Sequence, residues 1–214
     1  MTLLTWDDSD TAETAVLDRT AGQAPVIDLP AAQQAVADLL VALGRDPRSA
    51  HLRDTPRRVA GAYAELLTPA PFAMTTFPND ENYDELVLVT RIAFSSLCEH
   101  HLLPFSGVAH VGYLPGERIV GLSKLARVVR HFAGDMQVQE RLTVQIADFL
   151  DESLRPRGVG VILDAEHLCM SLRGVQAVGA RTVTSRLLGT LRDDPRSRQE
   201  FMALTTAASR AHGD

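Results

Sequence analysis

The sequence predicts an α+β fold in which two helices cover one face of a four-stranded sheet. Four stretches have the apolar alternation or the β-branched composition of strands, and they span residues 85–94, 108–114, 158–169 and 180–188. Two stretches with apolar residues at helical spacing lie between the second and third strands, and such helices need an apolar surface to cover. Because they account for only one face of the sheet, we expect association between chains to bury the other.

The composition indicates one globular domain with an appendage. The chain has 214 residues, of which 45% are hydrophobic and 22% are charged, and its formal net charge is −6. Residues 1–28 contain six acidic residues and one basic residue, so this segment is expected to be an acidic, mobile N-terminal tail. The remainder is nearly neutral and lacks the basic field that is typical of nucleic-acid binding.

The N-terminus is acidic and lacks the basic-then-apolar order of a signal peptide. No apolar run approaches the length of a membrane span. We therefore expect a cytoplasmic protein that binds neither nucleic acid nor a membrane.

Residues 29–68 are predicted to form a helical segment. A first helix begins near Pro30 and ends at Gly44, with apolar residues at helical spacing between them. A second helix begins with the capping sequence Asp54-Thr55-Pro56 and ends before Thr68. Both have a stripe of apolar residues to bury.

The main domain is expected to span residues 69–214, and its first part, residues 69–85, is rich in proline and predicted to be irregular. Ser123 is a good N-cap for the first of the two covering helices, and the second spans residues 138–154. A C-terminal helix begins near Asp194.

Cysteine and histidine residues gather at two points of the main domain. Cys98 and His101 are three residues apart, close enough for one turn of chain to direct both at a single ion. Cys169, the other cysteine, follows His167 by two positions, so their side chains would share a face of an extended segment. Thiolate and imidazole ligands suit zinc, and three protein ligands leave the fourth position open, as in catalytic zinc sites.

Three other interpretations of these residues stay open from spacing alone. The cysteines could be small buried apolar residues. The site could instead be closed and structural, with His167 or His110 as the fourth ligand. A disulfide between Cys98 and Cys169 is the third alternative, although thiols stay reduced in the cytosol.

Basic residues at one helix start predict an anion site. Ser123, Lys124 and Arg127 bring a hydroxyl, an ammonium and a guanidinium to a helix N-terminus, where backbone N–H groups are available. Arg173, just past the Cys169 segment, could supply a second phosphate contact. A solvated helix face that carries two basic residues is the alternative.

The next helix starts with Gln139 and Glu140, which offer a carboxamide and a carboxylate. A carboxylate can accept two parallel N–H bonds from the N1 and amino groups of guanine. Glu140 could equally be a charge that favours a helix N-terminus.

Together these stretches resemble the GTP cyclohydrolase I family. The motifs are SLCEHHLLPF at 96–105, GLSKLAR at 121–127, QVQERLT at 137–143, EHLCM at 166–170 and DTPRRVA at 54–60. The resemblance covers about residues 30–207, in order and at family spacing. It implies the tunnelling fold, in which the antiparallel sheets of neighbouring subunits join into a β-barrel, usually in a homodecamer of two pentamers with active sites between subunits.

The resemblance also implies the reaction, which converts GTP to 7,8-dihydroneopterin triphosphate and formate. Zinc held by Cys98, His101 and Cys169 would activate water to attack C8 of guanine. His167 would protonate N7 and help to open the imidazole ring, and His100 would act in proton transfers on the ribose side.

Further roles follow from the same resemblance. Ring opening is followed by loss of formate, an Amadori rearrangement of the sugar and ring closure. Ser123 would act in these steps on the ribose side, beside His100. Gln139 and Glu140 would hold the base. The triphosphate would be held by four basic residues, one of them from another subunit: Lys124, Arg127, Arg173 and the neighbour's Arg58.

Two departures from the family pattern lower the positive charge. Family members commonly carry a lysine where this chain has Gly61, and two basic residues where it has Gly134-Asp135. These changes predict weaker binding of the substrate, unless Arg57 or Arg181 compensates for the missing charge.

Two alternatives to GTP hydrolysis follow from the resemblance. The first is another tunnelling-fold enzyme, such as a nitrile reductase of deazaguanine synthesis or a pterin synthase. The Cys-His-Cys set with two further histidines argues against the reductase, which uses a nucleophilic cysteine. The second alternative is a non-catalytic relative that binds GTP without turning it over.

Overall fold

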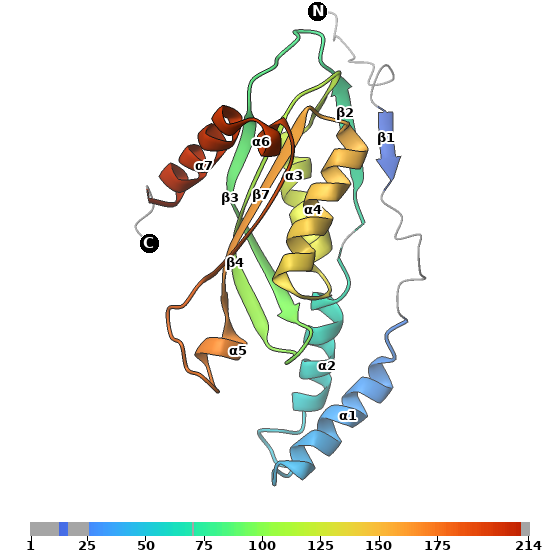
Figure 1. Cartoon of the computed structure of the whole chain (residues 1–214). Coiled ribbons are helices and arrows are strands. Elements are labelled where there is room, and N and C mark those ends of the chain that lie inside the picture. The colour runs from blue at the N-terminus through green and yellow to red at the C-terminus, as the bar shows by residue number, and fades with distance from the viewer. Residues whose placement is uncertain (1–12, 17–25, 70, 211–214) are drawn as a thin grey trace, which may run out of the picture. The chain divides into compact units, whose positions relative to one another are not determined.

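A computed structural model describes residues 13–16, 26–69 and 71–210, which divide into two units (Figure 1). The smaller unit holds the two predicted helices, α1 (Leu29–Ala42) and α2 (Thr55–Leu66), which pack against each other. Asp28 caps α1, because its carboxylate accepts a hydrogen bond of 2.9 Å from the Ala31 N–H. No residue of α1 is fully buried.

The larger unit is built on a five-stranded sheet with the order β6-β3-β4-β7-β8. The four predicted strands are present, and neighbours among them pair in antiparallel fashion. Their bounds are β3 (Val87–Cys98), β4 (Pro104–Leu114), β7 (Gly158–His167) and β8 (Thr182–Gly189). The fifth strand, β6 (Met136–Gln137), was too short to predict and pairs in parallel with the end of β3.

Helices α3 (Leu122–Ala133) and α4 (Gln139–Leu154) cover one face of this sheet, as predicted (Figure 1). Side chains from both helices and from alternate positions of the strands form the main core. Its fully buried members include Val128, Leu142, Ile146, Val161 and Leu163. Alternation along β7 directs Val161 and Leu163 to the helices and turns Ile162 to the opposite face.

The C-terminal helix corrects the expectation that the opposite face is bare within one chain. A short helix, α6 (Thr190–Asp193), turns the chain after β8, and α7 (Pro195–Arg210) then lies on that face (Figure 1). Phe201 of α7 is fully buried against it. A Cβ atom at Gly160 would lie 2.7 Å from the Phe201 ring, so glycine at this strand position permits the close approach.

A second sheet of three strands, in the order β1-β2-β5, also belongs to the larger unit. Strand β2 (Ala73–Pro78) pairs in antiparallel fashion with β1 (Glu13–Val16) and with β5 (Arg118–Val120). The prediction that residues 69–85 are irregular is therefore wrong for β2. The sequence predicts no strand within the acidic tail either, and the rest of that tail up to residue 25 lies outside the described residues.

No helix in the described part of the chain combines the length and apolar character that crossing a membrane requires.

Replacing Phe201 with alanine is expected to lower the free energy of unfolding by about 3–5 kcal/mol, because it empties a fully buried aromatic site. The measurement is chemical denaturation at one fixed protein concentration. Met202→Ala, at the next position of α7, is the matched control, since Met202 is exposed and its loss should cost only about 0.5 kcal/mol or less. Equal effects of the two substitutions would contradict the packing of α7 on the sheet.

Candidate active site

A tight turn between β3 and β4 brings Cys98 and His101 together. The backbone N–H of Cys98 donates to the carbonyl oxygen of Leu103 at 2.9 Å, and the N–H of Leu102 donates to the carbonyl oxygen of Cys98 at 2.8 Å. The turn leaves Cys98 buried and His101 exposed. It also places Nδ1 of His101 3.6 Å from Sγ of Cys98. One turn of chain therefore directs both side chains at one point, as their spacing predicts.

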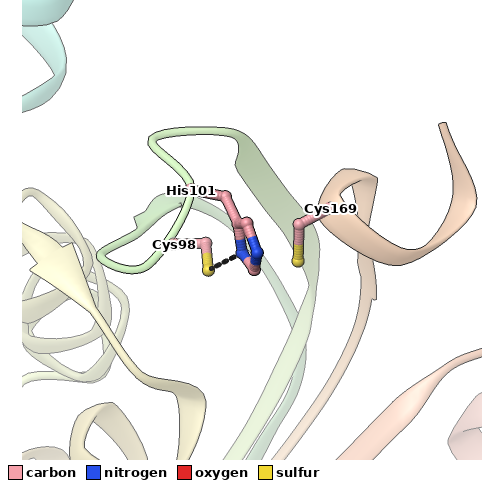
Figure 2. Close-up of side chains that lie close together, drawn as sticks. All are labelled: Cys98, His101 and Cys169. Carbon is pink, nitrogen blue, oxygen red and sulfur yellow. Dashed lines mark hydrogen bonds between the residues drawn. The ribbon is translucent and has the colours of Figure 1, made fainter. Parts of the chain in front are cut away.

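Cys169 reaches the same point from a helix rather than from a strand. Strand β7 ends at His167, and Cys169 lies in the short helix α5 (Leu168–Ser171). The prediction that the strand continues to Cys169 is wrong. The last pair between the two strands joins His167 to Phe105, and β4 begins only one residue before Phe105, so residues after His167 have no strand to pair with there. The helical turn nevertheless directs the thiol toward Cys98 and His101 (Figure 2).

The three side chains form a set that fits a metal ion. One ligand atom from each of Cys98, His101 and Cys169 lies within 4.8 Å of the others. Burial and the neighbouring Cys98 thiol raise the pKa of Cys169, while the charge of Arg173 opposes them. Two thiolates side by side would repel each other, and a divalent cation removes that cost. Two sulfur atoms and one imidazole nitrogen are donors that suit zinc.

The structure argues against a disulfide and against His110 as a fourth ligand. Cys98 and Cys169 are not joined in a disulfide. His110 lies five residues beyond Phe105 on β4, about 16 Å along the strand, and its Nε2 is 3.5 Å from the hydroxyl of Ser209 on α7. His110 is therefore not a fourth ligand of this site.

The ring of His167 is held from two directions. It stacks on Phe105 with ring centroids 4.5 Å apart and an interplanar angle of 2°. Its Nε2 lies 2.7 Å from Oε1 of Gln139. Burial lowers the pKa of His167, and the negative charge of Glu140 opposes that shift. Nε2 is thus already bonded within the protein, which argues against His167 as a metal ligand through that atom.

His100 and Arg173 also lie near the three candidate ligands. His100 is exposed, and its ring centroid is 6.2 Å from that of His101, with the rings at 77°. Arg173 follows α5, is exposed, and lowers the pKa of Cys169 by its charge. Both side chains are therefore accessible beside the candidate metal centre.

A network of polar contacts that no sequence motif signals supports the turn between β3 and β4. The guanidinium of Arg141, on α4, pairs with the carboxylate of Glu99 and donates to the Gln137 side-chain oxygen at 3.0 Å. The N–H of Glu99 donates to the backbone oxygen of Gln137 at 3.1 Å. Arg141 thereby lowers the pKa of Glu99. The partners are 42 residues apart, and no spacing in the sequence signals such a contact.

Arg141→Met is expected to weaken zinc binding by about 10-fold, because outer contacts that orient metal ligands typically contribute 10–100-fold to affinity. Competition with a chromogenic chelator measures the change. Arg198→Met removes a guanidinium from the exposed surface of α7 and serves as the control. An unchanged affinity in Arg141→Met would show that the ion pair with Glu99 does not support the turn.

The predicted phosphate ligands of α3 lie away from the metal set of the same chain. Ser123, Lys124 and Arg127 are in the first turns of α3, whose N-cap is Gly121 rather than Ser123. The end of α3 leads to β6, which pairs with Leu97 and Cys98. The ten residues from Lys124 to the end of the helix span about 15 Å at about 1.5 Å each.

A hydrogen bond next to the start of α3 also places that helix end far from the metal set. The Val120 N–H, just before α3, donates to the Tyr113 hydroxyl at 3.1 Å. Tyr113 lies eight residues beyond Phe105 on β4, which is about 26 Å along the strand. The start of α3 is therefore at the end of the sheet opposite to the metal set.

Comparison with known proteins identifies the family. The family model described as GTP cyclohydrolase I matches residues 32–206. The chain belongs to the GTP cyclohydrolase I family. The resemblance seen in the sequence is thereby confirmed.

Three relatives named GTP cyclohydrolase 1 illustrate the similarity. The one from Aquifex aeolicus is 51% identical over 178 residues, which cover 83% of this chain and 97% of the relative. The one from Mycobacterium marinum is 53% identical over 182 residues, with coverage of 83% and 90%. The one from Thermobifida fusca is 50% identical over 198 residues, with coverage of 90% and 96%.

Among solved structures, the chain is similar to the archaeosine synthase QueF-Like in the apo form. The TM-score is 0.39 at 17% sequence identity, over 49% of this chain and 93% of that chain.

The two departures from the GTP cyclohydrolase I pattern lie on α2 and just before β6. Gly61 is exposed on α2, and a Cβ atom there would meet nothing within 4 Å. The carboxylate of Asp135 accepts the Met136 N–H at 2.8 Å, next to β6. Arg58, also on α2, is exposed and pairs with Asp54 at 3.3 Å. Weaker binding of the substrate stays a prediction.

Proposed function

We propose that this protein is a zinc-dependent GTP cyclohydrolase I that converts GTP to 7,8-dihydroneopterin triphosphate and formate. The family and the names of its relatives support the activity. The observation that carries the chemistry is the group of Cys98, His101 and Cys169, whose ligand atoms lie within 4.8 Å of one another. We also propose a cytoplasmic location, where cysteine thiols stay reduced and available to a metal ion.

Each residue of the site has a role that its position supports. Zinc, when bound by the three ligands, supplies the Lewis-acid activation of water that catalytic sites with an open position provide. His167 protonates N7 of guanine, so that water addition at C8 can be followed by cleavage of the bond between C8 and N9. A second hydrolysis releases formate. His100, exposed beside His101, transfers protons at the ribose during the Amadori rearrangement that precedes ring closure.

Substrate contacts complete the proposal. Glu140 is exposed in the first turn of α4, where its carboxylate can accept the N1 and amino protons of guanine. Lys124, Arg127 and Arg173 bind the triphosphate, together with Arg58 from another copy, and Ser123 acts on the ribose side.

We further propose that each active site is completed by a second copy of the chain. The phosphate ligands of α3 and the metal set of one chain lie at opposite ends of the sheet, too far apart for one GTP molecule to join them. Apolar side chains that follow Cys169 are exposed in the single chain. They are Leu172, Val175, Val178 and Val183, with exposed fractions of 64%, 74%, 82% and 63%. A decamer of two pentamers is the assembly that we propose.

Shared active sites predict complementation between two defective variants. His167→Ala and Lys124→Ala damage different parts of a site, so co-expressed, differently tagged chains should form some sites that carry neither change. Random mixing predicts kcat/KM of about a quarter of the wild-type value, because each site draws one part from each of two copies. Assay of the doubly purified mixture measures it. Recovery no greater than the sum of the two variants would contradict a site shared between copies.

The function itself is tested with zinc-replete protein and GTP. We expect one formate and one 7,8-dihydroneopterin triphosphate for each GTP consumed, identified by mass spectrometry and by the absorbance of the oxidised pterin. GTP binding without either product would favour the non-catalytic alternative.

A further inference from the structure

The side chain of Gln139 is buried and bonded within the protein, although its neighbour Glu140 is exposed. Gln139 is the first residue of α4 and is 1% exposed. Its amide nitrogen lies 2.8 Å from the backbone oxygen of Thr182 and 3.2 Å from that of Leu163. The hydroxyl oxygen of Thr184 also lies within hydrogen-bond distance, at 3.1 Å, so the two N–H groups of the amide are shared among three acceptors.

These partners fix which way the amide of Gln139 points. Carbonyl oxygens only accept hydrogen bonds, so the end of the amide that faces Thr182 and Leu163 must be the NH₂ group. The hydroxyls agree with this direction. Thr143 donates to the Gln139 backbone oxygen at 2.7 Å, so it accepts from Thr184, and the Thr184 oxygen is left to accept from the amide.

The orientation of the amide determines the tautomer of His167. The amide oxygen faces Nε2 of His167 at 2.7 Å, and an amide oxygen cannot donate. Nε2 must therefore carry a hydrogen atom, and the lone pair of the neutral ring lies on Nδ1. Stacking on Phe105, with an interplanar angle of 2°, holds the plane of the ring. Nδ1 is then the ring nitrogen left for the reaction, and the ring must first take up a proton there before it can protonate N7 of guanine.

We propose that Gln139 is a positioning residue that acts on the reaction through His167 and selects Nδ1 as its working nitrogen, rather than binding the guanine base itself. The inference deepens the proposed function and rests on it for the role of His167. According to this proposal, the two adjacent residues at the start of α4 have different roles. Gln139 orients His167 from inside the protein, and Glu140 faces the base from the surface.

The tautomer is tested on the wild-type protein, independently of turnover. Zinc-loaded protein is labelled with ¹⁵N-histidine, and His167→Ala assigns the His167 signals in solid-state NMR spectra at a pH where the ring is neutral. We expect a protonated Nε2 and an unprotonated Nδ1. A proton on Nδ1 would overturn the proposal, even if the protein hydrolyses GTP. The expected tautomer without GTP hydrolysis would instead place the failure in the proposed function.

Kinetics of two neighbouring variants test the division of tasks. Gln139→Leu replaces the amide with a shorter apolar side chain and removes the contact with His167. We expect kcat to fall by about 10-fold or more, with KM within about threefold of wild type. Glu140→Gln should mainly raise KM. One bound zinc per chain in both variants checks that the site is folded. A raised KM with unchanged kcat in Gln139→Leu would show that Gln139 binds the base and would overturn the proposal.

Discussion

His167→Ala is expected to lower kcat for GTP by at least about 100-fold and to leave zinc binding intact. General acid–base groups typically contribute 10²–10⁴-fold, and the ring of His167 is held by Gln139 and Phe105 rather than by the metal ligands. Steady-state formate release and zinc content per chain are measured on the same preparation.

A surface histidine provides the control for this result. His51 is exposed in the smaller unit, and His51→Ala should leave kcat unchanged. If His167→Ala instead loses its zinc, the histidine supports the metal site. If it keeps near wild-type kcat, the assignment of His167 as the proton donor to guanine is wrong.

Cys169→Ser is expected to weaken zinc binding by more than about 100-fold and to abolish turnover with it. The substitution removes one of two thiolates from a site with three protein ligands, and a serine hydroxyl is not deprotonated at neutral pH to replace it. Zinc content after dialysis against a weak chelator measures the loss.

Met170→Ser is the matched control for Cys169→Ser. Met170 is the next residue of α5, is 37% exposed and is not among the candidate ligands, so this variant should keep one zinc per chain. Full zinc retention in Cys169→Ser would show that Cys169 is not a ligand, and would favour the alternative in which it is a half-buried apolar residue.

Local patterns predicted most of the larger unit because they reflect packing within one element. The four main strands and the two covering helices lie where apolar periodicity placed them. Strand β2 was missed because prolines flank it, and its stability comes from pairing with β1 and β5 rather than from its composition. The packing of α7 on the face opposite α3 and α4 depends on the turn at α6 and on the space above Gly160. Apolar periodicity within one helix predicts neither of them.

In the candidate site too, contacts between residues close in sequence could be predicted, and contacts between residues far apart in sequence could not. The spacing of Cys98 and His101 predicted their approach, because one turn of chain fixes it. Cys169 was expected at the site for the wrong reason, since it arrives on α5 and not on an extended strand. The burial of Gln139 depends on carbonyl groups of β7 and β8, far away in the chain. Residue type alone therefore could not separate its environment from that of Glu140.

Titrating zinc into metal-free protein while following formate release from GTP tests the metal site most directly. We expect the initial rate to rise in proportion to added zinc and to stop rising at one zinc per chain, with Cys169→Ser inactive throughout. Formate release without zinc, or none at one bound zinc per chain, would contradict the claim that Cys98, His101 and Cys169 hold the metal that hydrolyses GTP.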